Sequence, residues 1–242
     1  MKNVIVGASA GLGRALAEEL ASRGHTLMLV ASDPRDLDAL ANDLRLRFAI
    51  DAKSCVVDLR HFDTNTLYNE VIARMGEVDA LFLVAGFGDD ADCGPISNDL
   101  VRTLTEINYT APVMIANAFI NHLTSRPQGH IIGIGSVAAM RGRASNMIYG
   151  ASKRGLEFYF EALRIRLEAT SCRVQFYRAG FMATTMYKGK KGLLVADPAS
   201  VARRIADRLG GAQGLAYMPS FWSAIGFILC SLPYTVFRRL KI

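Results

Sequence analysis

Residues 4–13 read Val-Ile-Val-Gly-Ala-Ser-Ala-Gly-Leu-Gly, and this stretch decides the fold of the chain. The β-branched run Val4–Val6 predicts a buried strand, and leucines four residues apart from Leu12 onward predict a helix directly after it. Spaced glycines at such a turn let the backbone approach a ligand closely, and the N–H groups of the helix N-terminus attract a pyrophosphate. A simple glycine turn is the alternative, but this order of elements favours dinucleotide binding.

The rest of the chain alternates between short apolar runs and helical patterns. This alternation predicts an α/β fold, with a Rossmann-type, doubly wound, seven-stranded parallel sheet flanked by helices. We expect one domain over residues 1–220. An apolar-basic tail over residues 221–242 then either belongs to that domain or contacts a membrane surface. The predicted strands are Val4–Val6, Thr26–Val30, Cys55–Val57, Ala80–Val84, His130–Gly135, Val174–Tyr177 and Leu215–Met218.

The composition is that of a globular protein able to bury a sizeable core, with 51% hydrophobic residues in 242. The net charge of +6 indicates a solvated basic surface, and no aromatic-interleaved basic motif points to a nucleic-acid partner. The four cysteines and four histidines are scattered, which predicts reduced thiols and no metal site. The first apolar run is too short for a secretory signal, so we expect a cytoplasmic protein.

The end of the second predicted strand bears on the choice of dinucleotide. An acidic residue at this place selects the free 2′-hydroxyl of NAD(H). Here the first loop positions hold no acid, and Ser32, Arg14 or Arg35 can meet the 2′-phosphate of NADP(H). Asp33 follows immediately, so the loop favours NADP(H) only slightly and NAD(H) stays open.

Tyr149 and Lys153 stand one helical turn apart, on the same face of a predicted helix. A lysine ammonium beside a tyrosine favours the phenolate and lowers the pKa of the phenol, which ordinarily lies near ~10. Ser136 ends the fifth predicted strand, thirteen residues before the tyrosine, where its hydroxyl can hold a substrate carbonyl. The three residues together predict a proton-transfer site.

Two other positions allow more than one interpretation. Asn108 interrupts a helical region within residues 106–110, either as a structural kink or because its side chain bonds a specific group. Asp58, with Leu59, either contacts an adenine or caps the next turn.

The glycines at the strand ends, together with Asn108, Ser136, Tyr149 and Lys153, resemble the short-chain dehydrogenase/reductase family from residue 4 to about residue 218. The resemblance implies an NAD(P)(H)-dependent oxidoreductase, with Tyr149 as general acid/base and Lys153 holding the nicotinamide ribose. Asn108 would fix a water in the proton relay. The implied cofactor contacts are Gly7, Ser9, Gly11, Leu12, Gly13, Asp58, Leu59, Ala85, Gly86, Gly180 and Thr184, with Tyr149 and Lys153.

Two positions depart from the family pattern. The family's Asn-Asn-Ala-Gly is here Leu83-Val84-Ala85-Gly86, and its Pro-Gly after the sixth strand is Ala179-Gly180. The first change removes a polar support for the central strands, and the second loosens the turn that carries the nicotinamide contact. Neither change deletes a catalytic group.

A narrower resemblance links residues 106–110, 141–144 and 233–242 to the decaprenylphosphoryl-2-keto-pentose reductases. It implies reduction of a keto sugar on a polyprenyl phosphate, for cell-wall polymers. The alternatives are a ketoreductase of acyl thioesters or small carbonyls, and a non-catalytic dinucleotide-sensing regulator. The family resemblance also implies a homo-oligomer that pairs through the long helices around Asn108 and Tyr149.

Two features fit a lipid-linked phosphate. Arg141, Arg143 and the run Lys188–Lys191 predict a phosphate contact, with solvated loop charges as the alternative. Residues 221–234 are almost wholly apolar and a basic end follows, but the run is too short to span a bilayer and Pro233 breaks it. We therefore expect it to dock on the protein or to lie at a membrane interface, with peripheral location at the inner membrane face as one outcome.

Overall fold

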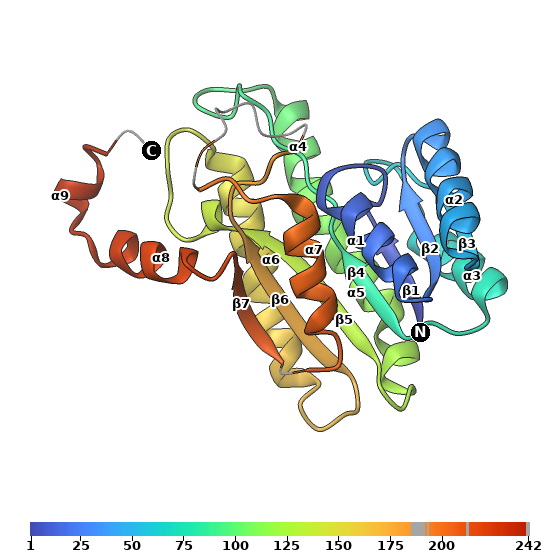
Figure 1. Cartoon of the computed structure of the whole chain (residues 1–242). Helices are drawn as coiled ribbons and strands as arrows, with labels where there is room; N and C mark the ends of the chain where they lie inside the picture. Colours follow the sequence, from blue (N-terminus) through green and yellow to red (C-terminus); the bar gives the residue numbers. More distant parts are fainter. Residues whose placement is uncertain (185–191, 193, 212, 241–242) are drawn as a thin grey trace.

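The computed structural model of the chain describes residues 1–184, 192, 194–211 and 213–240 (Figure 1). In this part of the chain, seven strands form one parallel sheet in the order β3-β2-β1-β4-β5-β6-β7, as the sequence predicted. The strands are β1 (Lys2–Val6), β2 (Thr26–Ala31), β3 (Ala52–Val56), β4 (Ala80–Leu83), β5 (His130–Ser136), β6 (Arg173–Ala179) and β7 (Gly214–Met218).

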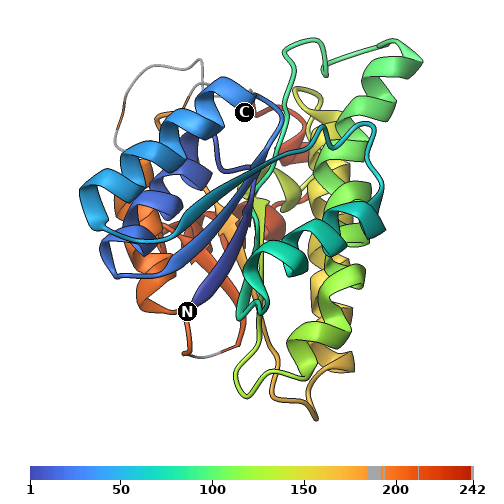
Figure 2. The same cartoon turned by 90° about the vertical axis from the view of Figure 1, so that its right-hand side faces the viewer.

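Helices cover both faces of the sheet (Figure 2). One layer holds α1 (Gly11–Ser22), α2 (Pro34–Phe48) and α7 (Pro198–Asp207). The other holds α3 (Thr64–Met75), α4 (Asn98–Thr105), α5 (Ala111–Thr124) and α6 (Met147–Arg166). A π-helical turn, η1 (Glu106–Thr110), joins α4 to α5, and the 3₁₀ turn η2 (Val137–Ala139) follows β5.

The strand period explains the two layers. Successive side chains of a strand point to opposite faces of the sheet. In β1, Ile5 therefore packs into the core beneath α1 and α2, while Val4 and Val6 pack into the core beneath α5 and α6. A strand buried on both faces must be apolar throughout, as this run is.

The arrangement of the central strands positions the site. The chain leaves β1 toward β2 on one side and reaches β4 on the other, so the connections diverge at the carboxyl ends of β1 and β4. Ligands of open α/β sheets bind in the crevice that such a divergence creates.

The tail forms two short helices that extend beyond β7, α8 (Trp222–Ser231) and α9 (Tyr234–Phe237), with Pro233 between them (Figure 1). Trp222 and Phe237 are buried, whereas Phe227 is 76% exposed. Among the residues that the structure describes, no helix combines the length and apolarity needed to cross a bilayer. The tail is thus anchored to the protein on one side only.

Candidate active site

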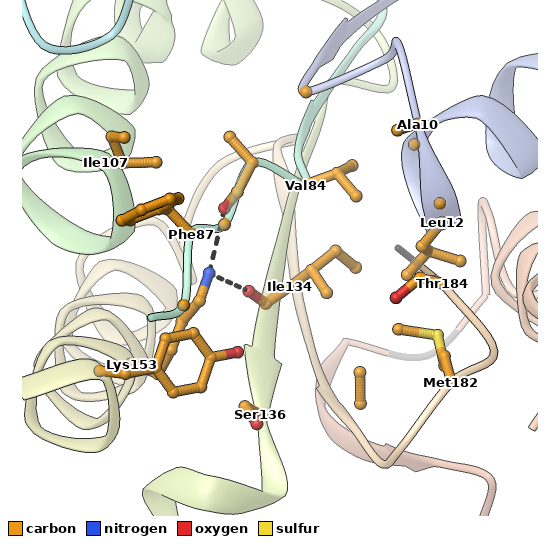
Figure 3. Close-up of a pocket in the computed structure, with 18 of the residues that line it drawn as sticks. Ala10, Leu12, Val84, Phe87, Ile107, Ile134, Ser136, Lys153, Met182 and Thr184 are labelled. Carbon is orange, nitrogen blue, oxygen red and sulfur yellow. Dashed lines mark hydrogen bonds between the residues drawn. The ribbon is translucent and has the colours of Figure 1, made fainter. Parts of the chain in front are cut away.

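A cavity of about 630 Å³ lies at the carboxyl ends of the strands (Figure 3). Leu12, Met182 and Thr184 form one side, and Lys153, Phe87 and Ile107 form the other. Of the predicted cofactor and catalytic residues, the lining includes Gly7, Ser9, Gly11, Leu12, Gly13, Ser32, Leu59, Ala85, Gly86, Ser136, Tyr149, Lys153, Gly180 and Thr184.

Two glycines of the turn lie where the neighbouring backbone leaves no space for a side chain. Gly7 has a φ of +91°, and a Cβ there would lie 2.6 Å from the Cα of Ala85. A Cβ on Gly13 would lie 1.9 Å from the carbonyl oxygen of Gly7. The turn therefore packs α1 closely against the strand ends and leaves a backbone cradle at the helix N-terminus.

The structure changes the prediction for the loop after β2. Ser32 lines the cavity, but the side chains of Arg14 and Arg35 do not: Arg14 pairs with Glu18, and Arg35 is 90% exposed beside Asp33. Asp33 caps α2, since its carboxylate accepts hydrogen bonds from the backbone N–H groups of residues 35 and 36. Asp33, the acidic residue because of which NAD(H) stayed an alternative, therefore has its carboxylate bound to the N-terminus of α2.

The side chain of Asp58 caps its turn, as the alternative interpretation predicted, because one carboxylate oxygen accepts a hydrogen bond from Arg60 N. Arg60 binds both carboxylate oxygens, and these hydrogen bonds lower the pKa of Asp58 to about 2. This side chain does not line the cavity, whereas the neighbouring Val57 and Leu59 do. A contact of Asp58 with the adenine stays a prediction.

Lys153 is buried one turn after Tyr149, and its ammonium donates hydrogen bonds to the carbonyl oxygens of Ala85, at 3.1 Å, and Ile134, at 3.2 Å (Figure 3). Burial lowers its pKa to about 8. The ammonium thereby joins the end of β4 to β5 at the floor of the cavity.

Tyr149 differs from the expectation in its pKa. Burial raises the pKa of the phenol, and this effect exceeds the opposing hydrogen bond with Ser136 and the positive charge of Arg143. The structure does not show the expected lowering of the Tyr149 pKa by Lys153. The phenol is therefore protonated at neutral pH.

Asn108 is fully buried in η1, and both interpretations of it hold. The helix forms a π-turn there, while the side-chain amide accepts from Phe87 N and donates to the carbonyl oxygens of Phe87 and Leu104. The amide holds the loop after β4 against the helix and does not line the cavity. A water relay at Asn108 stays a prediction.

The two arginines of the loop after η2 lie in different surroundings. Arg143 lines the cavity, and burial lowers its pKa, partly offset by Tyr149. Arg141 does not reach the cavity, which corrects the prediction. It donates to the carbonyl oxygens of Leu229 and Leu232, both at 2.6 Å, and stacks on Phe237. Lys188 lies outside the described residues.

Two residues of this region escaped the sequence analysis. Asp92 caps the N-terminus of α6 from a distant loop, and no local pattern signals such a contact. Trp222 packs on Gly180, where a Cβ would lie 1.9 Å from the indole nitrogen. The lone tryptophan beside an apolar run was the available signal. In the described parts of the chain, no acidic, cysteine or histidine cluster is arranged to hold a metal ion.

A dinucleotide cradle beside a Ser-Tyr-Lys group defines a class of oxidoreductases, and the comparisons give the family. The chain matches the short chain dehydrogenase family over residues 2–192, and it belongs to that family. A 3-oxoacyl-(acyl-carrier-protein) reductase of Bos taurus is 30% identical over 221 residues, covering 88% of this chain and 89% of the relative.

Two further relatives cover nearly the whole chain. An uncharacterized oxidoreductase of Mycobacterium tuberculosis is 27% identical over 244 residues, covering 98% of this chain and 96% of that protein. A short-chain dehydrogenase from Sphingobium yanoikuyae, solved in complex with NADPH, shares the fold at a TM-score of 0.82, with 23% identity and 96% of each chain covered.

Proposed function

We propose that this oxidoreductase uses NADP(H) to reduce a ketone on an anionic, lipid-linked substrate, with Tyr149 as the proton donor. The observation that carries this proposal is that Ser136, Arg143 and Tyr149 line one cavity, where the Ser136 hydroxyl and the Arg143 guanidinium both act on the phenol. A keto sugar on a polyprenyl phosphate, destined for cell-wall polymers, is the substrate that the narrower sequence resemblance favours.

The cavity fits a dinucleotide, because the glycine turn and the N-terminus of α1 line one end of it. When bound, NADPH supplies a hydride to the carbonyl carbon. The glycine turn, Ser32 and Thr184 would hold the cofactor, and Lys153 would hold its ribose. NADP(H) is favoured because Ser32 lines this end of the cavity, while Asp33 is engaged by α2. Relatives solved with NADP or NADPH support the same choice.

The residues of the site divide the proton chemistry between them. Ser136 donates a hydrogen bond to the carbonyl oxygen, where negative charge develops, and Tyr149 transfers its proton to that oxygen. Because burial raises the pKa of Tyr149, the phenol carries this proton at neutral pH, as reduction requires. The reverse oxidation needs the phenolate and gains from higher pH.

Arg143 supports an anionic substrate. In the described part of the chain no carboxylate pairs with its guanidinium, although burial has removed much of its water. A half-buried guanidinium without a carboxylate partner is costly, and a phosphate oxygen would satisfy it with strong, charge-assisted hydrogen bonds.

The tail supports a lipid-linked substrate. Trp222, at the start of α8, packs on Gly180 and Phe181 of the cavity wall. Beyond it, α8 and α9 expose large apolar side chains such as Phe227 and Tyr234, and Arg238 and Arg239 follow. Such a surface suits an anionic membrane interface, which would place the protein at the inner face of the membrane.

Pairing of subunits is the remaining part of the proposal. Met114 on α5 and Phe158 and Ile165 on α6 are exposed apolar side chains, the last two at 71% and 66%. Contact with a second copy through these two helices would cover them and form a homo-oligomer.

A second function has its own support. Relatives named 3-oxoacyl-(acyl-carrier-protein) reductase match most of this chain. The same Ser136, Tyr149 and Lys153 would reduce a 3-oxoacyl thioester, and the tail would then be a docking element alone.

A cofactor-oxidation assay tests both functions. It compares NADPH with NADH, and a polyprenyl-phosphate keto-pentose with an acetoacetyl thioester, for the wild type and the Tyr149→Phe variant. We expect NADPH-dependent turnover of the keto-pentose, lost in the variant while NADPH binding persists. Turnover of the thioester alone would sink the lipid-sugar proposal, and full activity of the variant would sink the mechanism. Flotation with anionic vesicles, with and without residues 221–242, tests the tail separately.

A further inference from the structure

The loop that leads out of β4 reaches the helix that carries the catalytic tyrosine. Asp92, which is 1% exposed, accepts hydrogen bonds from the backbone N–H groups of Ile148 and Tyr149, both at 2.8 Å, through its two carboxylate oxygens. Its own carbonyl oxygen accepts from Met147 N at 3.2 Å. One residue thus satisfies three of the N–H groups that the start of α6 leaves free.

The residue at the usual capping position does not take this role. Asn146 precedes α6 directly, but its side chain makes no capping hydrogen bond. Lys153 provides a further long-range tie between these elements, because it binds the carbonyl oxygen of Ala85, just after β4. Residues 86–90 line the cavity between these two ties, so the wall of the cavity and the first turn of α6 are fixed to each other.

We propose that Asp92 is a positioning residue for the reductase site, one that holds the backbone of Tyr149 and whose charge sets the pH range in which the phenolate forms. This inference rests on the proposed function of Tyr149. A helix N-terminus carries a positive partial charge that favours an anion in the first turn. A carboxylate at the same place offsets this effect, and the phenolate therefore forms at higher pH.

Other charges act on the same phenol from the surrounding elements. Arg143, in the loop before α6, favours the phenolate, and the ammonium of Lys153 lies one turn along α6. Asp89 and Asp90, in the loop of Asp92, are the acidic side chains that line the same cavity. Asp92 differs from these two acids because its side chain is bonded directly to the backbone of the tyrosine. A variant that removes the charge of Asp92 and keeps the other four charged side chains measures the effect of Asp92 on the phenol.

The test measures kcat/KM against pH for oxidation, by NADP⁺, of the alcohol produced in the reduction assay. Its acid limb reports phenolate formation. For Asp92→Asn and Asp92→Ser, which are neutral but keep an acceptor oxygen, we expect the midpoint to fall by about half a unit to one unit, the size of a charge at a helix end. We also expect turnover at the optimum to fall on the order of tenfold, because the tyrosine is held less firmly.

Two further variants separate charge from geometry. Asp92→Glu keeps the charge on a longer side chain, so it should reduce turnover and leave the midpoint in place. Asp99→Asn removes a 91%-exposed carboxylate that pairs with Arg102, and should change neither quantity. An unshifted midpoint in the folded Asn and Ser variants would overturn the role of Asp92. Activity of Tyr149→Phe would instead overturn the proposed function, so the two failures are distinguishable.

Discussion

Replacement of Lys153 by methionine should change how the stability of the fold depends on pH. The ammonium of Lys153 is buried, and burial lowers its pKa to about 8. The unfolded chain binds this proton more tightly, with the ordinary lysine pKa near ~10.4. Between about pH 8 and about pH 10 the unfolded state therefore holds more protons, and the free energy of unfolding of the wild type rises with pH.

The magnitude follows from the distance between the two pKa values. A pKa about two and a half pH units below that of free lysine corresponds to a penalty of about 3 kcal/mol at pH 7, where folded and unfolded chains are both protonated. Most of this penalty is relieved by pH 10, so the wild type should gain about 2.5 kcal/mol over that interval relative to Lys153→Met. Loss of the hydrogen bonds to Ala85 and Ile134 shifts the variant by a constant, which cancels from the pH dependence.

Urea unfolding of both proteins at pH 7, 8, 9 and 10 measures this difference. The groups that the two proteins share titrate equally and drop out. Lys53→Met is the matched control, because that ammonium lies at the surface beside Asp51, and its difference from wild type should stay flat. If the Lys153→Met difference is equally flat, the ammonium is not desolvated, and its assignment as a buried cation at the cavity floor is wrong.

Two further predictions concern the tail. Arg141→Ala leaves two carbonyl oxygens at the end of α8 without their donor, so we expect faster proteolysis within residues 222–240. We also expect a raised KM for the ketone with unchanged NADPH affinity. Equal cleavage rates of the variant and the wild type would contradict this. Gly180→Ala places a Cβ 1.9 Å from the Trp222 nitrogen, and we expect it to destabilise the fold by about 1–3 kcal/mol in urea unfolding. Gly142→Ala is the control for Gly180→Ala, because nothing lies within 4 Å of its Cβ, and it should leave the free energy of unfolding unchanged.

The fold followed from the sequence because its signals are local. Apolar runs and helical spacing place the strands and helices within a few residues, and the alternation determines the parallel sheet. The third strand shows the limit: it was predicted to begin at Cys55 but begins at Ala52, because the edge strand β3 carries half-buried polar residues such as Lys53 and Ser54. An edge strand lacks the continuous apolar pattern of a central one.

The site was predictable only where chemistry and spacing coincide. Ser136, Tyr149 and Lys153 line one cavity, as their spacing indicated. The direction of a loop side chain is set by distant contacts, so Arg141 could not be told apart from Arg143 in sequence. The role of Asp92 could not be predicted for the same reason, since its hydrogen-bond partners lie 56 and 57 residues later in the sequence.

The loop between η2 and α6 links the tail to the chemistry. Arg141 fixes this loop to α8 and α9, and two residues later Arg143 faces Tyr149 in the cavity. Met140 adds a second contact, because a Cβ on Gly226 of α8 would lie 2.4 Å from its sulfur. A change in how the tail docks must therefore move the loop, and with it the guanidinium that we assign to the substrate anion. We therefore expect a change in the docking of the tail to alter substrate binding through Arg143.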